Sequence, residues 1–516
     1  MRAKIALALL LTAPLLAQQA PAPPPFRVEE TTIAQIHDAM KAGRLTCRAL
    51  VDAYLRRIDA YDKNGPSLNA IVIVNPDARK QADDLDRRLA QSGPVGPLHC
   101  IPAIVKDNFE TIGLQSAAGS LSLKGFVSNK DAFLVKRIKD AGAIVLAKSN
   151  MAEFAFSPYE TVNSLLPGYT RNPYALDRVT AGSSGGTAAA VAANFGAIGL
   201  GSDTGNSIRG PSSHQALAGI RSTMGLTSRA GVVPLSLLAD IAGPMTRELA
   251  DAVAVFQVIA GEDPDDPATA AAHGRPIPNY AQSLQRDGLK GARIGILRQA
   301  YERDTTDPEI VDVFMAAIED LKRAGATIVD PARVELGEVR RQQGTGQCGG
   351  FKYDINRYLA AQGDRVPVHT LEEIIRSRRF HPSVEARLQS AQTGTENGPD
   401  TPACKAEADY REAFRGAVTR TMDAIKLDAF VYPTWSNPPR LIGDLNTPHG
   451  DNSQVYSPTT GWPSINVPMG YTRGTLPAGM TFFGRAWSEP ILIKLAYAYE
   501  QATRHRHPPA SVPPLR

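Results

Sequence analysis

Residues 187–203 read TAAAVAANFGAIGLGSD, and this stretch carries the pattern that decides the fold. An Ala-rich run of helix-forming residues is interrupted at Gly196, and the short apolar run AIGL follows directly. Alanine has the highest helix propensity, whereas glycine commonly ends a helix because it adopts left-handed backbone angles without strain. The stretch therefore predicts a helix, a turn and a buried strand, which is the connection typical of parallel sheets.

The same helix–glycine–strand pattern recurs twice, at residues 131–151 and 307–330. Amphipathic spacing predicts further helices, in segments 31–62 (a pair, the second capped by Thr46), 78–93 and 489–503. Apolar runs predict further strands, in segments 68–74, 100–109, 292–298, 427–434 and 463–471. We expect a single large α/β domain with a mixed, mostly parallel central sheet and helices on both faces, and a polar surface loop at 391–404.

Length and composition are those of a globular protein. The chain has 516 residues, of which 43% are hydrophobic and 21% charged, enough to bury a substantial core. The formal charge of +4 and the lack of a basic stripe with interleaved aromatic residues give no reason to expect a nucleic-acid partner. The oligomeric state stays open.

The two ends differ from the body of the chain. Residues 1–17 place two cations before a short apolar stretch, the pattern of a secretory signal rather than of a stable membrane span. Residues 18–27 form a Pro-rich spacer, residues 28–505 form the folded domain, and residues 506–516 form a polar tail. We interpret the run RHRH at 504–507 as solvated, and we expect export to the periplasm or the medium.

Four cysteines, Cys47, Cys100, Cys348 and Cys404, have no metal-ligand spacing. Export would permit disulfides. A bridge between Cys348 and Cys404 and two free buried thiols are equally compatible with the sequence.

Three stretches carry residues capable of chemistry: VKDNF with Lys106, AGSSGG with Ser183 and Ser184, and SDTGNSIRG with Ser207. Each one alone is compatible with a structural role, because serines and glycines before a helix commonly cap its free N–H groups. Together they indicate nucleophilic catalysis. A serine needs a base, and a lysine that leaves the apolar run IPAIV can be that base if burial lowers its pKa.

These motifs resemble those of the amidase signature family, serine hydrolases with a Ser–cis-Ser–Lys triad. The resemblance rests on GPLHCIPAIVKDNF at 96–109, AGSSGGTAAAVAANF at 181–195 and GLGSDTGNSIRGPSSH at 199–214. It continues through GWPSINVPMGY at 461–471 and over residues 476–503, and so covers most of the mature chain.

The resemblance implies roles for individual residues. Ser207 matches the acylating nucleophile, Ser183 the bridging serine after a cis peptide bond, and Lys106 the base. The backbone N–H groups of Thr204, Gly205, Asn206 and Ser207 match the oxyanion hole. Gly182, Ser184, Asp203 and Arg209 match supporting positions. The reaction implied is hydrolysis of a small-molecule amide through an acyl-enzyme, with no metal and no organic cofactor.

The sequence departs from the family pattern at two positions. Asn206 stands where the family commonly has a second glycine, and Asn is the residue that best tolerates left-handed backbone angles after glycine. Cys100 stands where a glycine is usual, and we interpret it as a small buried thiol.

The substrate and some alternatives remain open. FKYDINRYL at 351–359 resembles a helix of the peptide-amidase branch, but an ordinary amphipathic helix that packs Phe351, Ile355 and Tyr358 accounts for it equally well. The family also acts on fatty-acid amides, aryl amides, carbamates, ureas and esters. Three rivals are a Ser-His-Asp hydrolase with Ser184 in a G-x-S-x-G turn, one component of an amidotransferase that acts on charged tRNA, and a scaffold without turnover.

Overall fold

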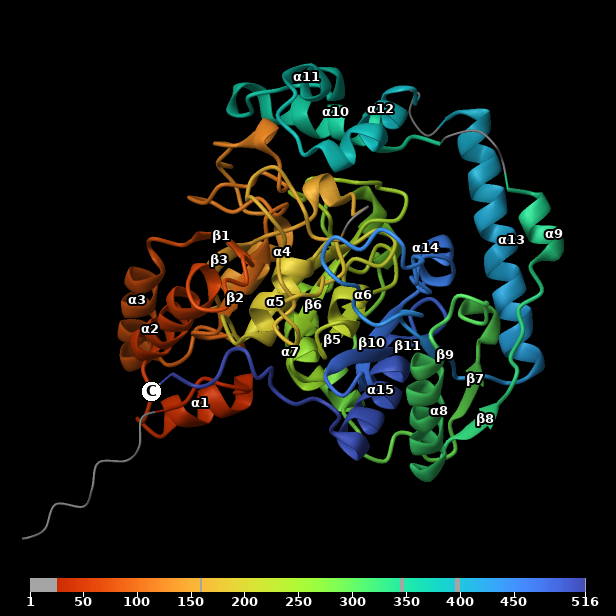
Figure 1. Cartoon of the computed structure of the whole chain (residues 1–516). Helices are drawn as coiled ribbons and strands as arrows, with labels where there is room; N and C mark the ends of the chain where they lie inside the picture. Colours follow the sequence, from red (N-terminus) through yellow and green to blue (C-terminus); the bar gives the residue numbers. More distant parts are fainter. Residues whose placement is uncertain (1–25, 158–159, 344–347, 395–399, 516) are drawn as a thin grey trace, which may run out of the picture.

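Eleven strands form one mixed sheet through the middle of the molecule (Figure 1). The structure is a computed structural model and describes residues 26–157, 160–343, 348–394 and 400–515. In spatial order the strands are β1 (Ile71–Val74), β3 (Ile144–Ser149), β2 (Pro102–Lys106), β4 (Ile198–Asp203), β6 (Ile241–Thr246), β5 (Ala218–Arg221), β10 (Ser464–Thr472), β11 (Leu476–Phe483), β9 (Ala429–Pro433), β7 (Arg293–Ile296) and β8 (Thr327–Val329).

The parallel pairings come in two groups. Strands β3, β2 and β4 are parallel neighbours, and so are β9, β7 and β8. Antiparallel pairings through β6, β5, β10 and β11 join the groups, and β1 adds to β3 antiparallel. The prediction of one α/β domain with a mixed sheet is confirmed. Strands β5, β6 and β11 had no predicted counterpart, because they are short or contain glycine and proline, which weaken a strand pattern.

The α-helices follow the predicted segments and add several others. They are α1 (Ile33–Lys41), α2 (Cys47–Ile58), α3 (Ala78–Ser92), α4 (Phe133–Asp140), α5 (Gly185–Ala192), α6 (Arg209–Ser213), α7 (Leu249–Ile259), α8 (Pro308–Arg323), α9 (Gly337–Arg341), α10 (Phe351–Gln362), α11 (Leu371–Ser377), α12 (Glu385–Gln392), α13 (Pro402–Ala424), α14 (Tyr456–Thr460) and α15 (Glu489–Thr503). Thr46 caps α2 through the N–H of Ala49, as predicted.

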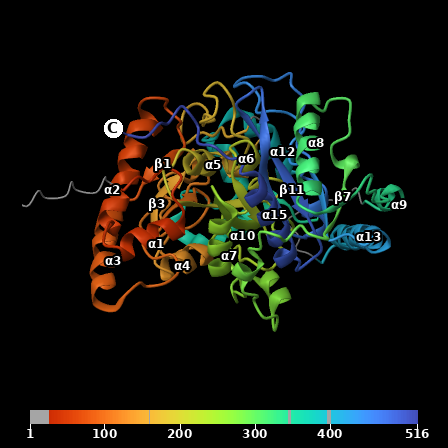
Figure 2. The ribbon, with the colours of Figure 1, turned by 90° about the horizontal axis from the view of Figure 1, so that it is seen from below.

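Helices pack on both faces of the sheet, as expected. Helix α5 packs on β4 and helix α6 packs on β10, and the two helices also contact each other. A second series of helices runs in the order α4, α7, α15 and α8, each in contact with the next. Within this series α7 packs on β6, and α15 and α8 pack on β10. Helices α2 and α3 lie at one end of the molecule and α9 and α13 at the other (Figure 2).

Helices α10, α11 and α12 form a separate layer at the top of Figure 1. Their apolar side chains make a second hydrophobic cluster with residues of the main body, among them Met151, Phe154 and Val233. The amphipathic packing expected for the α10 segment is confirmed, since Phe351 and Ile355 are buried and Tyr358 is partly buried.

The predicted loop at 391–404 is correct only in part. Residues 391 and 392 complete α12, and α13 already begins at Pro402, where Thr401 accepts a hydrogen bond from the N–H of Cys404. Residues 395–399 lie outside the described residues. The turn-rich composition favoured a loop, although the proline at its end begins a helix. Proline is a residue suited to the first helical turn.

All four cysteines are paired. Cys348 is bonded to Cys404, which settles the alternative that the sequence left open. The interpretation of Cys100 as a free thiol is wrong, because Cys100 is bonded to Cys47. These two residues are 53 positions apart, and only the packing of α2 beside the start of β2 brings their Cα atoms to 5.3 Å.

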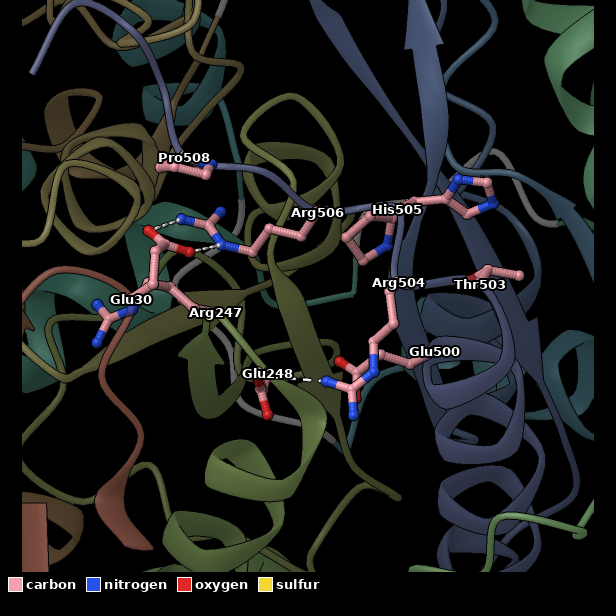
Figure 3. A pocket seen from close by; sticks show the side chains of 10 residues that line it. Glu30, Arg247, Glu248, Glu500, Thr503, Arg504, His505, Arg506 and Pro508 are labelled. Carbon is pink, nitrogen blue, oxygen red and sulfur yellow. Dashed lines mark hydrogen bonds and ion pairs between the residues drawn. The ribbon is translucent and has the colours of Figure 1, made fainter. Parts of the chain in front are cut away.

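The C-terminal segment packs on the domain instead of extending into solvent. Arg506 donates from Nε and Nη2 to the carboxylate of Glu30, over 2.7 and 2.8 Å (Figure 3). Buried Arg57 donates to the carbonyls of Val512 and Pro513. The interpretation of the RHRH run as solvated is therefore wrong for Arg506, whose ion pair fastens the chain end to the N-terminal segment.

The predicted secretory signal, residues 1–17, lies outside the described residues, as does most of the spacer. Among the helices that the structure describes, none combines the length and the apolar character that crossing a bilayer requires.

Candidate active site

Lys106 stands at the carboxyl end of β2, between the parallel strands β3 and β4. The run PAIV is buried along its whole length, so the strand delivers the lysine side chain into the interior. The carboxyl ends of neighbouring parallel strands share one edge of the sheet, the usual place for a site in an open α/β fold. Strand β4 ends at this edge too, and Asp203 is its last residue.

Lys106 meets two serines there. Its Nζ lies 2.7 Å from Ser183 Oγ and 2.9 Å from Ser202 Oγ, and it also reaches the carbonyl of Ser202 over 3.4 Å. Lys106 and Ser183 are both fully buried. The two predicted triad members, 77 residues apart in sequence, are thus in direct hydrogen-bond contact.

Burial strongly affects this lysine. Desolvation lowers the pKa of Lys106 to about 7, although the negative charges of Asp203 and Asp240 oppose the shift. A buried ammonium that lacks a carboxylate partner in contact is costly, and the neutral amine avoids that cost. A large fraction of Lys106 is therefore uncharged near neutral pH.

The bond between Gly182 and Ser183 is a cis peptide, as the resemblance implied. Gly182 cannot be replaced without a clash, since a Cβ there would come within 2.8 Å of Ser157 Cβ. Ser183 and Ser184 precede α5, which starts at Gly185.

Ser184 has its hydroxyl engaged with backbone. Its Oγ donates to the carbonyl of Ser202 over 3.1 Å, and its N–H donates to the carbonyl of Ser207 over 3.3 Å. The residues before it, 173–182, form turns and irregular backbone, not the strand that a nucleophile elbow needs. These contacts place Ser184 as a support for the loop that holds Ser207.

Ser207 follows β4 in a loop that Asp203 braces. The Asp203 carboxylate accepts from the N–H of Ile208 over 3.0 Å and forms ion pairs with Arg209 and Arg221, at 3.2 and 2.9 Å. Arg209 also donates to the carbonyl of Gly205. Burial alone would raise the pKa of Asp203, but the two guanidinium groups outweigh it and lower the pKa to about 2.

Thr204, Gly205, Asn206 and Ser207, whose backbone N–H groups we predicted as the oxyanion hole, line one cavity of about 250 Å³ together with Gly182. Ser207 is 7% exposed. The rest of the wall comes from distant segments, including Phe156, Glu160, Leu235, Trp435, His449 and Asp451. The predicted nucleophile and its loop thus line a cavity large enough for a small acyl group.

Asn206 does not need the left-handed backbone that we invoked to explain it. Its φ lies outside the positive region that favours glycine. Its side chain is 4% exposed, and neither amide atom has a hydrogen-bond partner among the described residues. Asn206 therefore fills space beside Gly210 and Trp435 without making polar contacts.

Several residues of the site escaped the sequence interpretation. Ser202 contacts Lys106, and Asn108 Nδ2 donates to Ser202 Oγ over 3.0 Å. Arg221 is the second partner of Asp203. Asn108 and Ser202 lie inside the quoted motifs, close in sequence to Lys106 and Ser207. Their position could therefore have identified them as residues of the site. Arg221 and His449 lie in segments that gave none.

The comparisons with known proteins agree with this geometry. The family model described as Amidase matches residues 49–493. The chain belongs to the amidase signature family. A peptide amidase from Stenotrophomonas maltophilia, of known crystal structure, superposes with a TM-score of 0.83 at 37% identity, covering 93% of this chain and 98% of that one. This amidase signature protein is thus a hydrolase of amide C–N bonds, and two of its triad candidates, Lys106 and Ser183, are in contact at the sheet edge.

Two curated relatives match over nearly their full length. A probable amidase of Arabidopsis thaliana is 34% identical over 94% of this chain and 92% of its own. A glutamyl-tRNA(Gln) amidotransferase subunit from Synechococcus is 31% identical over 91% of this chain and 96% of its own.

Proposed function

We propose that this amidase signature protein is an exported serine amidohydrolase that removes the C-terminal amide group of short peptides. Ser207 is the nucleophile, Ser183 the proton relay and neutral Lys106 the base. The contact of 2.7 Å between Lys106 Nζ and Ser183 Oγ carries the proposal.

The surroundings of Lys106 orient its lone pair. A neutral amine has two N–H bonds, and the carbonyl and hydroxyl oxygens of Ser202 offer an acceptor for each. Asn108 Nδ2 donates to the same hydroxyl oxygen over 3.0 Å, so Ser202 Oγ accepts from both Asn108 and Lys106. The lone pair of Lys106 is then left for the hydroxyl proton of Ser183.

The steps follow from this arrangement. Ser207 attacks the amide carbonyl, its proton passes to Ser183, and the proton of Ser183 passes to Lys106. The tetrahedral oxyanion accepts from the backbone N–H groups of residues 204–207. The proton then returns to the leaving nitrogen, ammonia departs, and water hydrolyses the acyl-enzyme through the same relay.

The choice of a peptide amide rests on similarity and on the cavity. The superposed relative from Stenotrophomonas is a peptide amidase. Apolar Phe156, Leu235 and Trp435 beside the loop of Ser207 suit an acyl group with a side chain. A panel of peptide amides, anilides, carbamates, ureas and esters, read by released ammonia or acid, tests the choice. Peptide amides must give the highest kcat/KM, and preference for any other class would overturn it.

The similarity to amidotransferase subunits supports a second candidate, transfer of ammonia to charged tRNA. The predicted secretory signal favours hydrolysis outside the cytoplasm, where charged tRNA is not present. Fractionation of cells that express the tagged full-length protein separates the two. Export with cleavage of the N-terminal segment is expected, and cytoplasmic retention would favour the transferase.

A further inference from the structure

The cavity at Ser207 adjoins a second one. The second cavity, of about 360 Å³, shares Phe156 and Arg387 with the first. Sites for small-molecule ligands commonly measure about 300–1,000 Å³, and the first cavity alone lies below that range. The two together provide room for a substrate that extends well beyond its scissile amide.

The second cavity has an apolar wall of its own. Phe351, at the start of α10, meets Phe156 edge to face, with ring centroids 4.9 Å apart. Leu238 faces the same space and is 38% exposed, so its side chain is accessible from the cavity. An apolar side chain of a substrate would remove water from these three residues.

Two charged groups stand beside this wall. The guanidinium of Arg387, at the junction of the cavities, is exposed and has no ion-pair partner among the residues that the structure describes. Glu407 lies in the second cavity and accepts from Arg411 over 2.6 Å, which leaves other lone pairs of its carboxylate open. Arg387 can donate to a carbonyl of a peptide backbone, and Glu407 can accept from a backbone N–H.

The disulfide between Cys348 and Cys404 joins two sides of this cavity. Cys348, Gly349 and Gly350 form its wall next to Phe351, and Cys404 lies one helical turn before Glu407 on α13. The disulfide links the two ends of the chain segment that contains α10, α11 and α12. It therefore fixes the spacing between the apolar wall and α13.

We propose that the second cavity is a binding subsite for a peptide residue on the N-terminal side of the scissile amide, with an apolar side chain on Phe156, Leu238 and Phe351. Arg387 and Glu407 bind the backbone of that residue, and the Cys348–Cys404 disulfide holds the subsite open. This inference rests on the proposed function.

The test compares kcat/KM for two amides: an N-acetyl amino acid amide, which occupies the first cavity only, and an N-acetyl tripeptide amide with leucine at its first position. We expect the wild-type protein to prefer the tripeptide by at least tenfold. Leu238→Asp and Arg387→Ala should each reduce that preference about tenfold. Leu237→Asp and Arg376→Ala, at exposed positions outside both cavities, are the matched controls and should keep it.

A double variant, Cys348→Ser with Cys404→Ser, should reduce the preference in the same way, provided that its melting temperature shows a folded protein. Leu238→Asp and Arg387→Ala change exposed side chains, so the test stands even if the double variant does not fold. Hydrolysis of the short amide with no preference for the tripeptide would overturn the subsite alone. Hydrolysis of neither amide would overturn the proposed function as well.

Discussion

Lys106 Nζ and Ser183 Oγ lie 2.7 Å apart in a fully buried contact, and no carboxylate of the described residues shares it. The negative charges of Asp203 and Asp240 act on the lysine without a hydrogen bond to it. The carboxylate of Asp203 forms ion pairs with two arginines instead. This arrangement keeps the amine poised between its two protonation states.

The pH dependence of turnover follows from the pKa of Lys106, which burial lowers to about 7. The protonated form has no lone pair, so it cannot accept the proton of Ser183. The kcat/KM for a peptide amide should therefore rise as the pH increases through about 7 and level off above it. Initial rates across this range, in buffers of constant ionic strength, measure the profile.

Ser202 should act as a positioning residue for Lys106. Ser202→Ala removes the hydroxyl acceptor at 2.9 Å, and we expect kcat to fall about 10- to 100-fold with little change in KM. Ser202→Thr keeps the hydroxyl and should restore most of kcat. Equal losses in both variants would mean that packing, rather than the hydrogen bond, is responsible.

Asp203→Asn should destabilise the fold more than an ordinary surface change. It leaves the fully buried Arg209 and Arg221 without their carboxylate, and breaking a buried ion pair costs about 3–5 kcal/mol. Urea unfolding measures the loss. Asp304→Asn, at an exposed position, is the control and should change the free energy of unfolding by less than about 0.5 kcal/mol.

The same carboxylate contributes to acid stability. Its pKa is about 2 in the folded protein, against 3.8 as the ordinary value, so the unfolded chain binds the proton more readily. The stabilisation is present above about pH 4 and is lost as the pH falls toward 2. Asp203→Asn should therefore flatten the dependence of unfolding free energy on pH in this window.

Asn206→Gly should leave kcat within about threefold of the wild type. The side chain of Asn206 makes no hydrogen bond to the described residues, and its proposed contribution is the backbone N–H, which glycine also has. Steady-state kinetics with one peptide amide are sufficient. A loss of a hundredfold or more would show that the side chain, not the backbone, assists the reaction.

His449 offers a stringent comparison because it lines the same cavity as Ser207. Burial lowers its pKa, and its ring packs against Trp435 with centroids 5.3 Å apart. If Lys106 is the base, His449→Ala should retain at least a tenth of the wild-type kcat, while Lys106→Ala should lose about 10²- to 10⁴-fold. The reverse order would favour a serine–histidine mechanism.

The parts of the fold with a strong local pattern could be predicted from the sequence. The helix–glycine–strand units gave α5 with β4 and α8 with β8, because apolar periodicity and glycine act over a few residues. β6 (IAGPMT) could not be recognised, because its glycine and proline suit a strand only once its neighbours pair with it. The Cys47–Cys100 bond likewise depends on tertiary packing.

The candidate site shows the same limit. Lys106, Ser183 and Ser207 were recognisable because they stand in specific motifs, and the structure brings Lys106 and Ser183 into contact. Arg221 and His449 come from elements whose sequences carry no comparable signal, and the fold alone places them near the loop of Ser207. Local pattern identified the residues proposed for the chemistry, whereas their surroundings required the folded chain.

Labelling with a fluorophosphonate probe tests the central claim most directly, since the probe reacts only with an activated serine. Peptide mapping should locate the label on Ser207, and the labelling rate should rise as the pH increases through about 7. In Lys106→Ala, shown to be folded by its melting temperature, labelling should be almost abolished. Labelling of Ser184 instead, or an unchanged rate in Lys106→Ala, would contradict the account.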